Sequence, residues 1–253
     1  MGKVLFMKIQ LVSDTHGNLE RFKIAEEADL IIHTGDFTSG VGDSIKYISE
    51  FAELCKSHNK DYVLVKGNHD YYGFVYRDEI LKRLDYLEIN YLITGKEFKF
   101  KDWTFIGDTL FTEFNLPNYD NEFIKENAQY YLNDFTHIRY NPSSMITPQD
   151  YISEFYKQYD WINSFRNKEN IFVVTHFVPS MELIHPYYAD NPLNPYFLNN
   201  LDLTGFQHWA VGHSHQTLRK KVNNCNVYMN AYGYTNGTEW ECPQFDTNYL
   251  IEL

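Results

Sequence analysis

Seven side chains that can bind metal ions closely follow predicted strands, and their placement is the strongest chemical signal in the sequence. They comprise two carboxylates, one amide and four imidazoles: Asp14, His16, Asp36, Asn68, His176, His213 and His215. In open α/β sheets, ligands bind beyond the carboxyl ends of the strands. We therefore expect these side chains to meet in one site, although they lie far apart in the sequence.

The chemistry of this set favours a pair of divalent metal ions. Mixed nitrogen and oxygen ligands without a thiolate suit Mn²⁺, Fe or Zn²⁺ better than Ca²⁺ or Mg²⁺ alone. Seven ligands exceed what one ion with an open position needs, whereas they suit two ions that share a carboxylate. Such a pair clamps a phosphoryl group and lowers the pKa of a bound water. Hydrolysis of a phosphoester is the reaction that this set predicts.

The elements that position these residues alternate regularly at the start of the chain. Three short apolar runs predict buried strands, and helical patterns separate and follow them. In chain order these elements are Met7–Ser13, Leu19–Ala28, Asp29–Thr34, Ser44–Ser57, Tyr62–Val65 and Glu79–Leu87. Alternating strands and helices are typical of an α/β fold with a parallel sheet.

The pattern changes in the rest of the chain. A helix is expected at Thr147–Phe165, and further strands are expected at 98–100, 103–106, 171–175, 207–211, 227–230 and 248–252. Residues 107–146 show weak periodicity and many Asn, Tyr and Phe residues, so we expect a lid or insertion there. We find no linker that would divide the chain, and we expect a single domain over residues 1–253.

Five blocks of the sequence resemble the calcineurin-like metallophosphoesterase superfamily, in the order that this family shows. They are Asp14-Thr15-His16, Gly35-Asp36, Gly67-Asn68-His69-Asp70, the lone His176, and Gly212-His213-Ser214-His215. Phe105–Asn115 and Asn133–Phe135 are similar to a bacterial and phage branch of cytosolic phosphohydrolases. The resemblance implies a four-layer α-β-β-α sandwich of two mixed sheets.

The resemblance also implies a role for each ligand and for two neighbours. One ion of Mn, Fe or Zn would be bound by Asp14, His16 and His215, and the other by Asn68, His176 and His213, with Asp36 bridging them. His69 would protonate the leaving oxygen, which requires a titratable group within hydrogen-bond reach. Asp70 would orient His69. The implied reaction is attack on phosphorus by a metal-activated hydroxide.

A few residues outside these blocks are candidates for binding the substrate. Tyr71 and Tyr72 follow the third block, where their rings would stack on a base or an aromatic leaving group, with packing in the core as the alternative. Asn133 and Asp134 would line the site from the insertion, although Asn-Asp is also a common turn pair. His185 lies in a proline-rich loop and is a candidate for the same pocket.

The net charge and the composition limit the classes of substrate that the sequence favours. The chain has 34 acidic and 22 basic residues, and its net charge of −12 disfavours long polyanions. We therefore expect a small phosphodiester or a nucleotide, with a nuclease on DNA or RNA as the alternative. A phosphomonoesterase or protein phosphatase is a further alternative, but the Gly35-Asp36 block lacks the arginine of the protein phosphatase branch. A non-catalytic scaffold is least expected, because all seven ligand positions are filled.

The sequence favours a cytoplasmic location. Its three cysteines, Cys55, Cys225 and Cys242, are scattered, as expected in a reducing compartment. There is no run of about 18 apolar residues that would predict a membrane span. The N-terminal residues lack the pattern of a signal peptide.

Overall fold

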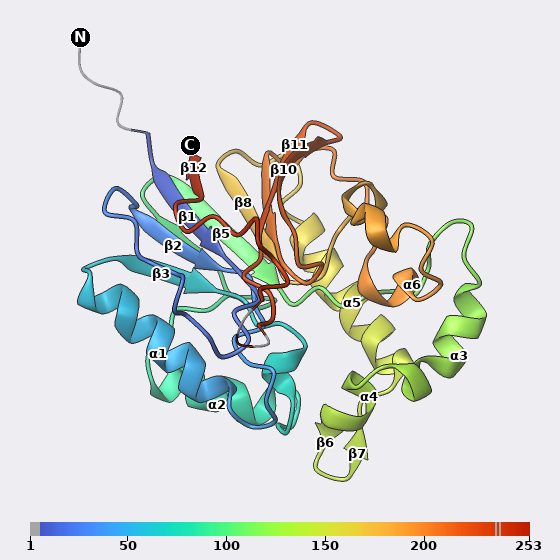
Figure 1. The fold of residues 1–253 in the computed structure, drawn as a ribbon. Coiled ribbons are helices and arrows are strands. Elements are labelled where there is room, and N and C mark those ends of the chain that lie inside the picture. The colour runs from blue at the N-terminus through green and yellow to red at the C-terminus, as the bar shows by residue number, and fades with distance from the viewer. Residues whose placement is uncertain (1–5, 236, 238) are drawn as a thin grey trace.

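Two mixed β-sheets form the centre of the computed structural model, which describes residues 6–235, 237 and 239–253 (Figure 1). The first sheet has the strand order β12-β1-β2-β3. Its strands are β1 (Lys8–Val12), β2 (Leu30–His33), β3 (Asp61–Leu64) and β12 (Leu250–Glu252). Strands β1, β2 and β3 are parallel, as predicted, and β12 pairs with β1 in the antiparallel sense.

The second sheet has the order β10-β11-β9-β8-β5-β4. Its strands are β4 (Phe98–Phe100), β5 (Trp103–Asp108), β8 (Ile171–Thr175), β9 (His208–Val211), β10 (Thr217–Val222) and β11 (Cys225–Asn230). The four central strands are parallel, and each edge strand is antiparallel to its neighbour. Strand β10 is missing from the sequence prediction, because charged residues, which are common at sheet edges, replace the apolar pattern.

Apolar side chains of the two sheets form one buried cluster between them. Ile9, Leu11 and Ile32 of the first sheet belong to the same cluster as Phe172 and Val174 of the second. Because both faces of each sheet are covered, the sequences of the central strands are mostly apolar and do not alternate between apolar and polar residues. This packing joins the two sheets into a rigid base for the loops at their ends.

Helices cover the outer faces of the two sheets and complete the expected α-β-β-α sandwich (Figure 1). Helices α1 (Ser44–Ser57) and α2 (Asp78–Tyr86) lie beside the first sheet, and α5 (Pro148–Asn163) contacts β5 of the second. Helix α5 begins with a capping box, in which Thr147 accepts a hydrogen bond from Asp150 N–H and Asp150 accepts one from Thr147 N–H. Among the described helices, none has the length and apolar character needed to cross a membrane.

The helix predicted at Leu19–Ala28 is wrong, because this segment consists of turns and irregular backbone. The Gln10 side chain donates to Lys23 C=O at 2.7 Å and accepts from Ala25 N–H at 2.9 Å. Lys23 N–H donates to Thr247 Oγ1 at 3.0 Å. These tertiary hydrogen bonds satisfy backbone groups that a helix would pair internally, so they override the local helical composition.

Two regions extend beyond the ends of the sheets. The first, within residues 107–146, contains α3 (Asn121–Tyr131), α4 (Asp134–His137) and a hairpin of β6 (Arg139–Asn141) and β7 (Ser144–Met145). The second is the proline-rich segment predicted as a loop. It contains two 3₁₀ turns, Met181–Leu183 and Pro186–Tyr188, and the short helix α6 (Asn194–Phe197). Helices α3 and α6 contact each other, so the two regions lie together on one side of the molecule (Figure 1).

Candidate metal centre

The candidate ligands leave the carboxyl ends of strands from both sheets, as predicted. The sheets meet at this end, where Ser13 forms a parallel bridge with Ala231. Strands β1, β2, β3, β8 and β9 supply, in turn, Asp14 and His16, Asp36, Asn68, His176, and His213 and His215. The loops also bond to one another: Asp14 N–H donates to Gly35 C=O at 2.9 Å, and His16 N–H donates to Asp36 C=O at 3.1 Å. Five separate segments therefore converge on one site.

Left-handed backbone conformations concentrate at this site. Five of the seven candidate ligands have positive φ: Asp14, His16, Asp36, His213 and His215. This conformation is uncommon outside glycine and costs about 1–3 kcal/mol per residue. It persists here because the packed strands and the hydrogen bonds between loops fix the backbone on both sides.

Glycine is required where the loops after β2 and β3 touch. Gly35 has φ +98°, and a Cβ there would lie 2.5 Å from Gly67 N and 2.7 Å from His176 Nδ1. A Cβ on Gly67 would collide with the carboxylate of Asp36. The two glycines thus allow the backbones to approach closely enough to hold Asp36 beside the third sequence block.

The first group of ligand atoms consists of Asp14, His16 and His215, all within 4.8 Å of one another. The Nε2 atoms of His16 and His215 are 3.1 Å apart, and His215 Nε2 lies 3.6 Å from Asp14 Oδ1. The carboxylate of Asp14 also accepts a hydrogen bond from His213 N–H at 3.0 Å. This is the grouping that the resemblance implies for one metal ion.

The second group consists of Asp36, His176 and His213, again within 4.8 Å of one another. His176 Nε2 lies 3.1 Å from His213 Nδ1 and 3.4 Å from Asp36 Oδ2. Asn68 joins this group, because its Oδ1 lies 3.1 Å from His176 Nε2. His176 Nδ1 lies 2.8 Å from Thr34 C=O, to which it donates, so Nε2 is the nitrogen left to face the group.

The electrostatics of both groups fit a cation. Burial lowers the pKa of His16 to about 3 and lowers that of His213 well below its usual value, so both are neutral, the form that binds metals. Burial opposes charge on His176, but Asp36 outweighs it and raises the His176 pKa to about 9. Among the described residues, the buried His16 Nδ1 and His213 Nε2 have no hydrogen-bond partner. Burial likewise opposes charge on His215, but Asp14 and Glu241 outweigh it and raise the His215 pKa to about 10. A divalent ion would replace the protons on His176 and His215, so these imidazoles beside ionised carboxylates are a donor set suited to divalent ions.

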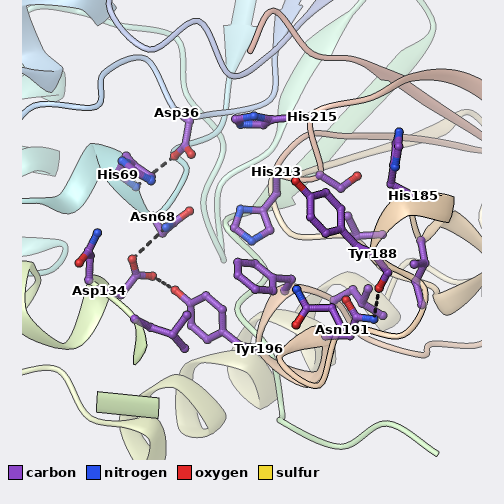
Figure 2. A pocket seen from close by; sticks show the side chains of 18 of the residues that line it. Asp36, Asn68, His69, Asp134, His185, Tyr188, Asn191, Tyr196, His213 and His215 are labelled. Carbon is purple, nitrogen blue, oxygen red and sulfur yellow. Dashed lines mark hydrogen bonds between the residues drawn. The ribbon is translucent and has the colours of Figure 1, made fainter. Parts of the chain in front are cut away.

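His69 lies beside the second group and lines a cavity next to it (Figure 2). Its backbone N–H donates to Asp36 Oδ1 at 3.0 Å. Its ring packs against Tyr72, with ring centroids 4.5 Å apart. Among the described residues, its buried Nδ1 has no hydrogen-bond partner.

The expected role of Asp70 in orienting His69 is wrong. The buried carboxylate of Asp70 accepts hydrogen bonds from the backbone N–H groups of Asp36 and Phe37, both at 2.9 Å, and of Gly67 at 2.8 Å. Burial, together with the nearby Asp36, raises the pKa of Asp70 to about 7. Asp70 therefore fastens the loop after β2 to the loop after β3 and is withdrawn as a catalytic residue.

A cavity of about 390 Å³ opens beside the ligand groups (Figure 2). Tyr72, Asn133 and His185, which were expected in the substrate pocket, all line it. Tyr71 does not belong to its described wall: this side chain is fully buried, and its hydroxyl lies 3.3 Å from Thr109 Oγ1. We therefore withdraw Tyr71 from the substrate pocket.

Comparison with protein families agrees with this site. The family model of the calcineurin-like phosphoesterases matches residues 7–217, which is more than half of the chain. The chain belongs to the calcineurin-like phosphoesterase family. It is therefore a metal-dependent phosphoesterase, and members of this family typically bind two divalent ions. Comparison with curated proteins gives no match.

The fold of this phosphoesterase is also found in a solved structure. Phosphopantetheinyl hydrolase (PptH) from Mycobacterium tuberculosis is 14% identical, with a TM-score of 0.66 and 90% of each chain covered. NAD nucleotidase (NadN) of Haemophilus influenzae is 15% identical, with a TM-score of 0.44, and the alignment covers 91% of this chain and 46% of that one. At this identity, the likeness to PptH shows the fold alone.

Two residues that the ligand prediction omits contact His215 of the candidate metal centre. Glu241 Oε2 lies 2.5 Å from His215 Nδ1, so this carboxylate orients the imidazole that faces the first group. Cys242 Sγ donates to His215 C=O at 3.1 Å and holds the backbone of the same residue. Neither residue lies in a predicted strand or helix, and no local sequence signal would have found them.

Asp134 supports the second group in a similar way. Its buried carboxylate accepts hydrogen bonds from Asn68 Nδ2 at 2.9 Å and from the Tyr196 hydroxyl (Figure 2). It also accepts from the hydroxyls of Tyr72 and Tyr151. Four donors fill the acceptor positions of one carboxylate. The bond to Asn68 directs the Nδ2 atom of the amide toward Asp134, and it leaves Oδ1 facing His176.

We expect Asp134→Asn to weaken metal binding about 10- to 100-fold, because an amide cannot accept all four hydrogen bonds and Asn68 loses its fixed orientation. Calorimetric titration of the metal-free protein with Mn²⁺ measures this change. Asp102→Asn, a substitution of an exposed residue in the β4–β5 turn, provides the matched control. Equal affinities in the two variants would show that Asp134 does not position Asn68.

Proposed function

We propose that this phosphoesterase hydrolyses a small phosphodiester or a nucleotide at the two ligand groups. The proximity of the donor atoms in each group, beside a cavity of about 390 Å³, is the observation that carries the proposal. We assign one divalent ion to Asp14, His16 and His215, and the other to Asn68, His176 and His213, with Asp36 between them. Manganese is our first choice of metal, with iron and zinc as the alternatives.

Most of the mechanism can be assigned to side chains of the chain itself. When bound, two divalent ions supply the Lewis acidity that polarises a phosphoryl group and lowers the pKa of water. His69 lies at the border between the ligand groups and the cavity, where its imidazole can donate a proton to the leaving oxygen. The apolar walls of the cavity exclude water from the organic part of the substrate.

The size and surroundings of the cavity support a small substrate. A volume of about 390 Å³ lies within the range of small-molecule sites. We propose that residues 107–146 form a lid within a single domain, because Tyr131, Leu132 and Asn133 contribute to the cavity wall. We also propose a cytoplasmic enzyme, supported by three free, buried cysteines.

Metal dependence tests the proposed function. We expect the rate at which the protein hydrolyses bis(4-nitrophenyl) phosphate to fall at least about 10²-fold after treatment with a chelator, because no ion then polarises the phosphoryl group. Added Mn²⁺ should restore it, and Fe²⁺ and Zn²⁺ are tested in parallel with 4-nitrophenyl phosphate as the monoester. Fewer than two bound ions per chain together with no turnover would instead support a non-catalytic protein. Degradation of DNA or RNA fragments at a higher rate would support a nuclease.

A further inference from the structure

The cavity has two chemically different ends. Candidate ligands and His69 form one end, whereas the opposite wall comes mainly from the segment 178–198 and from the insertion (Figure 2). That wall includes the buried side chains of Val178, Leu183 and Leu198 and the ring of Phe197. A phosphoryl group held at the first end therefore places its organic group against a largely apolar surface.

No lysine or arginine lines the cavity within the described part of the chain. Its imidazoles lie mainly at the ligand end, and the exception, His185, accepts a hydrogen bond through Nδ1 from Tyr187 N–H at 3.1 Å. A second phosphate or a carboxylate on the substrate would lose its hydration without meeting a fixed cationic partner. Burying an unpaired charge in this way is strongly unfavourable.

Two carboxylates line the cavity without belonging to the candidate ligands, and both already have donors from the protein. Asp134 accepts four side-chain hydrogen bonds, as described above. Glu241 Oε2 pairs with His215 Nδ1 and also accepts from Tyr234 N–H at 3.1 Å. These two carboxylates are therefore poorly placed to bind a cationic group of the substrate, because such a group would compete with existing hydrogen bonds.

The polar groups that remain on this wall are amides and hydroxyls. Asn191 lies on the wall at intermediate exposure, and its Oδ1 accepts from Leu193 N–H at 2.9 Å (Figure 2). Asn133 is a second amide, and Tyr188 adds a partly exposed aromatic side chain. Amides and phenols can bind uncharged polar groups of an organic molecule without requiring a counter-charge.

From this wall we infer that the enzyme selects phosphoesters whose organic group is uncharged and largely apolar, and that it rejects esters with a second anionic group. The inference rests on the proposed function, because it takes the phosphoryl group to be held at the ligand groups. Phosphoesters of neutral alcohols would then be substrates, whereas nucleoside polyphosphates and bisphosphates would be rejected. The neutral alcohol is the leaving group, and water supplies the hydroxyl that remains on phosphorus.

Two esters of the same shape but different charge test this selectivity. The probes are 4-carbamoylphenyl phosphate and 4-carboxyphenyl phosphate, with the corresponding bis-aryl diesters as a second pair. Phosphate or phenol release is measured with the metal-loaded enzyme. Within each pair that the enzyme hydrolyses, we expect kcat/KM to be at least about tenfold higher for the carbamoyl ester than for the carboxylate ester. The reason is that the carboxylate meets no cation in the cavity.

A lysine on the cavity wall should remove this preference. We expect Asn191→Lys to raise kcat/KM for the carboxylate ester about tenfold, since the new ammonium supplies the missing partner. Asn200→Lys is the matched control, because Asn200 is exposed and does not belong to the cavity wall. It makes the same substitution outside the cavity and should leave the ratio of the two rates unchanged. Thermal unfolding of both variants checks that they fold.

The outcomes separate this inference from the proposed function. Equal rates for the charged and uncharged esters in the native protein would overturn the inference while leaving a metal-dependent phosphoesterase in place. An equal response of Asn191→Lys and Asn200→Lys would also overturn it, because net charge rather than the cavity wall would then set selectivity. No turnover of any ester with any of the metals would overturn the proposed function and, with it, the inference.

Discussion

Asp36→Asn is expected to lower kcat/KM for bis(4-nitrophenyl) phosphate on the order of 10³-fold. Its Oδ2 atom lies 3.4 Å from His176 Nε2, and its Oδ1 atom accepts from His69 N–H. Although burial raises the pKa of Asp36, the charges of His176 and His69 outweigh it and hold this pKa well below the usual value. The charge of Asp36 also acts on His16 in the first group. An amide of the same shape removes the charge that both groups share.

Metal content distinguishes this effect from a general loss of structure. The variant should bind fewer divalent ions per chain than the native protein, as measured by elemental analysis after removal of free metal. Asp43→Asn is the control, because Asp43 is exposed in the loop before α1 and its side chain makes no capping hydrogen bond. Native turnover with two ions bound to Asp36→Asn would show that Asp36 does not bridge them.

The candidate ligands are predictable because each depends on a local feature. A short, mostly apolar strand followed by a polar residue can be recognised within a short window, as at Val12–Asp14 or Thr175–His176. Parallel strands then bring their carboxyl ends together, so the convergence follows from the fold. The sandwich itself was implied by the resemblance, while the parallel half of it follows from the alternation of strands and helices.

Interactions between distant residues are what the sequence does not reveal. Three tyrosines from separate segments reach Asp134, and no local pattern marks them as partners. The resemblance implies that Asp70 orients His69, whereas in the structure the Asp70 carboxylate accepts hydrogen bonds from backbone N–H groups. His69 and Asp70 lie in one 3₁₀ turn, in which adjacent side chains point in different directions, and Asp70 faces the loop after β2.

His69→Ala should lower kcat/KM about 10²- to 10⁴-fold for phosphoesters with an alkoxide leaving group, because such a group must be protonated as the bond to phosphorus breaks. Its side chain lines the cavity beside Asn68 and Asp36, the position from which a proton can reach the leaving oxygen. The loss should be much smaller for esters of 4-nitrophenol, which leaves readily without a proton. This dependence on the leaving group is a signature that a structural role of His69 would not produce.

The same variant should keep its metal ions, because His69 is not assigned as a ligand, and this separates it from Asp36→Asn. His58→Ala, which removes an exposed imidazole at the end of α1, controls for the loss of a histidine. An equal loss for alkyl and nitrophenyl esters, accompanied by a loss of bound metal, would mean that His69 acts by organising the ligands. A selective loss for the alkyl esters would identify His69 as the proton donor. The two ligand groups would then hold the metal ions that activate the phosphoryl group, and the His69 imidazole would protonate the leaving oxygen.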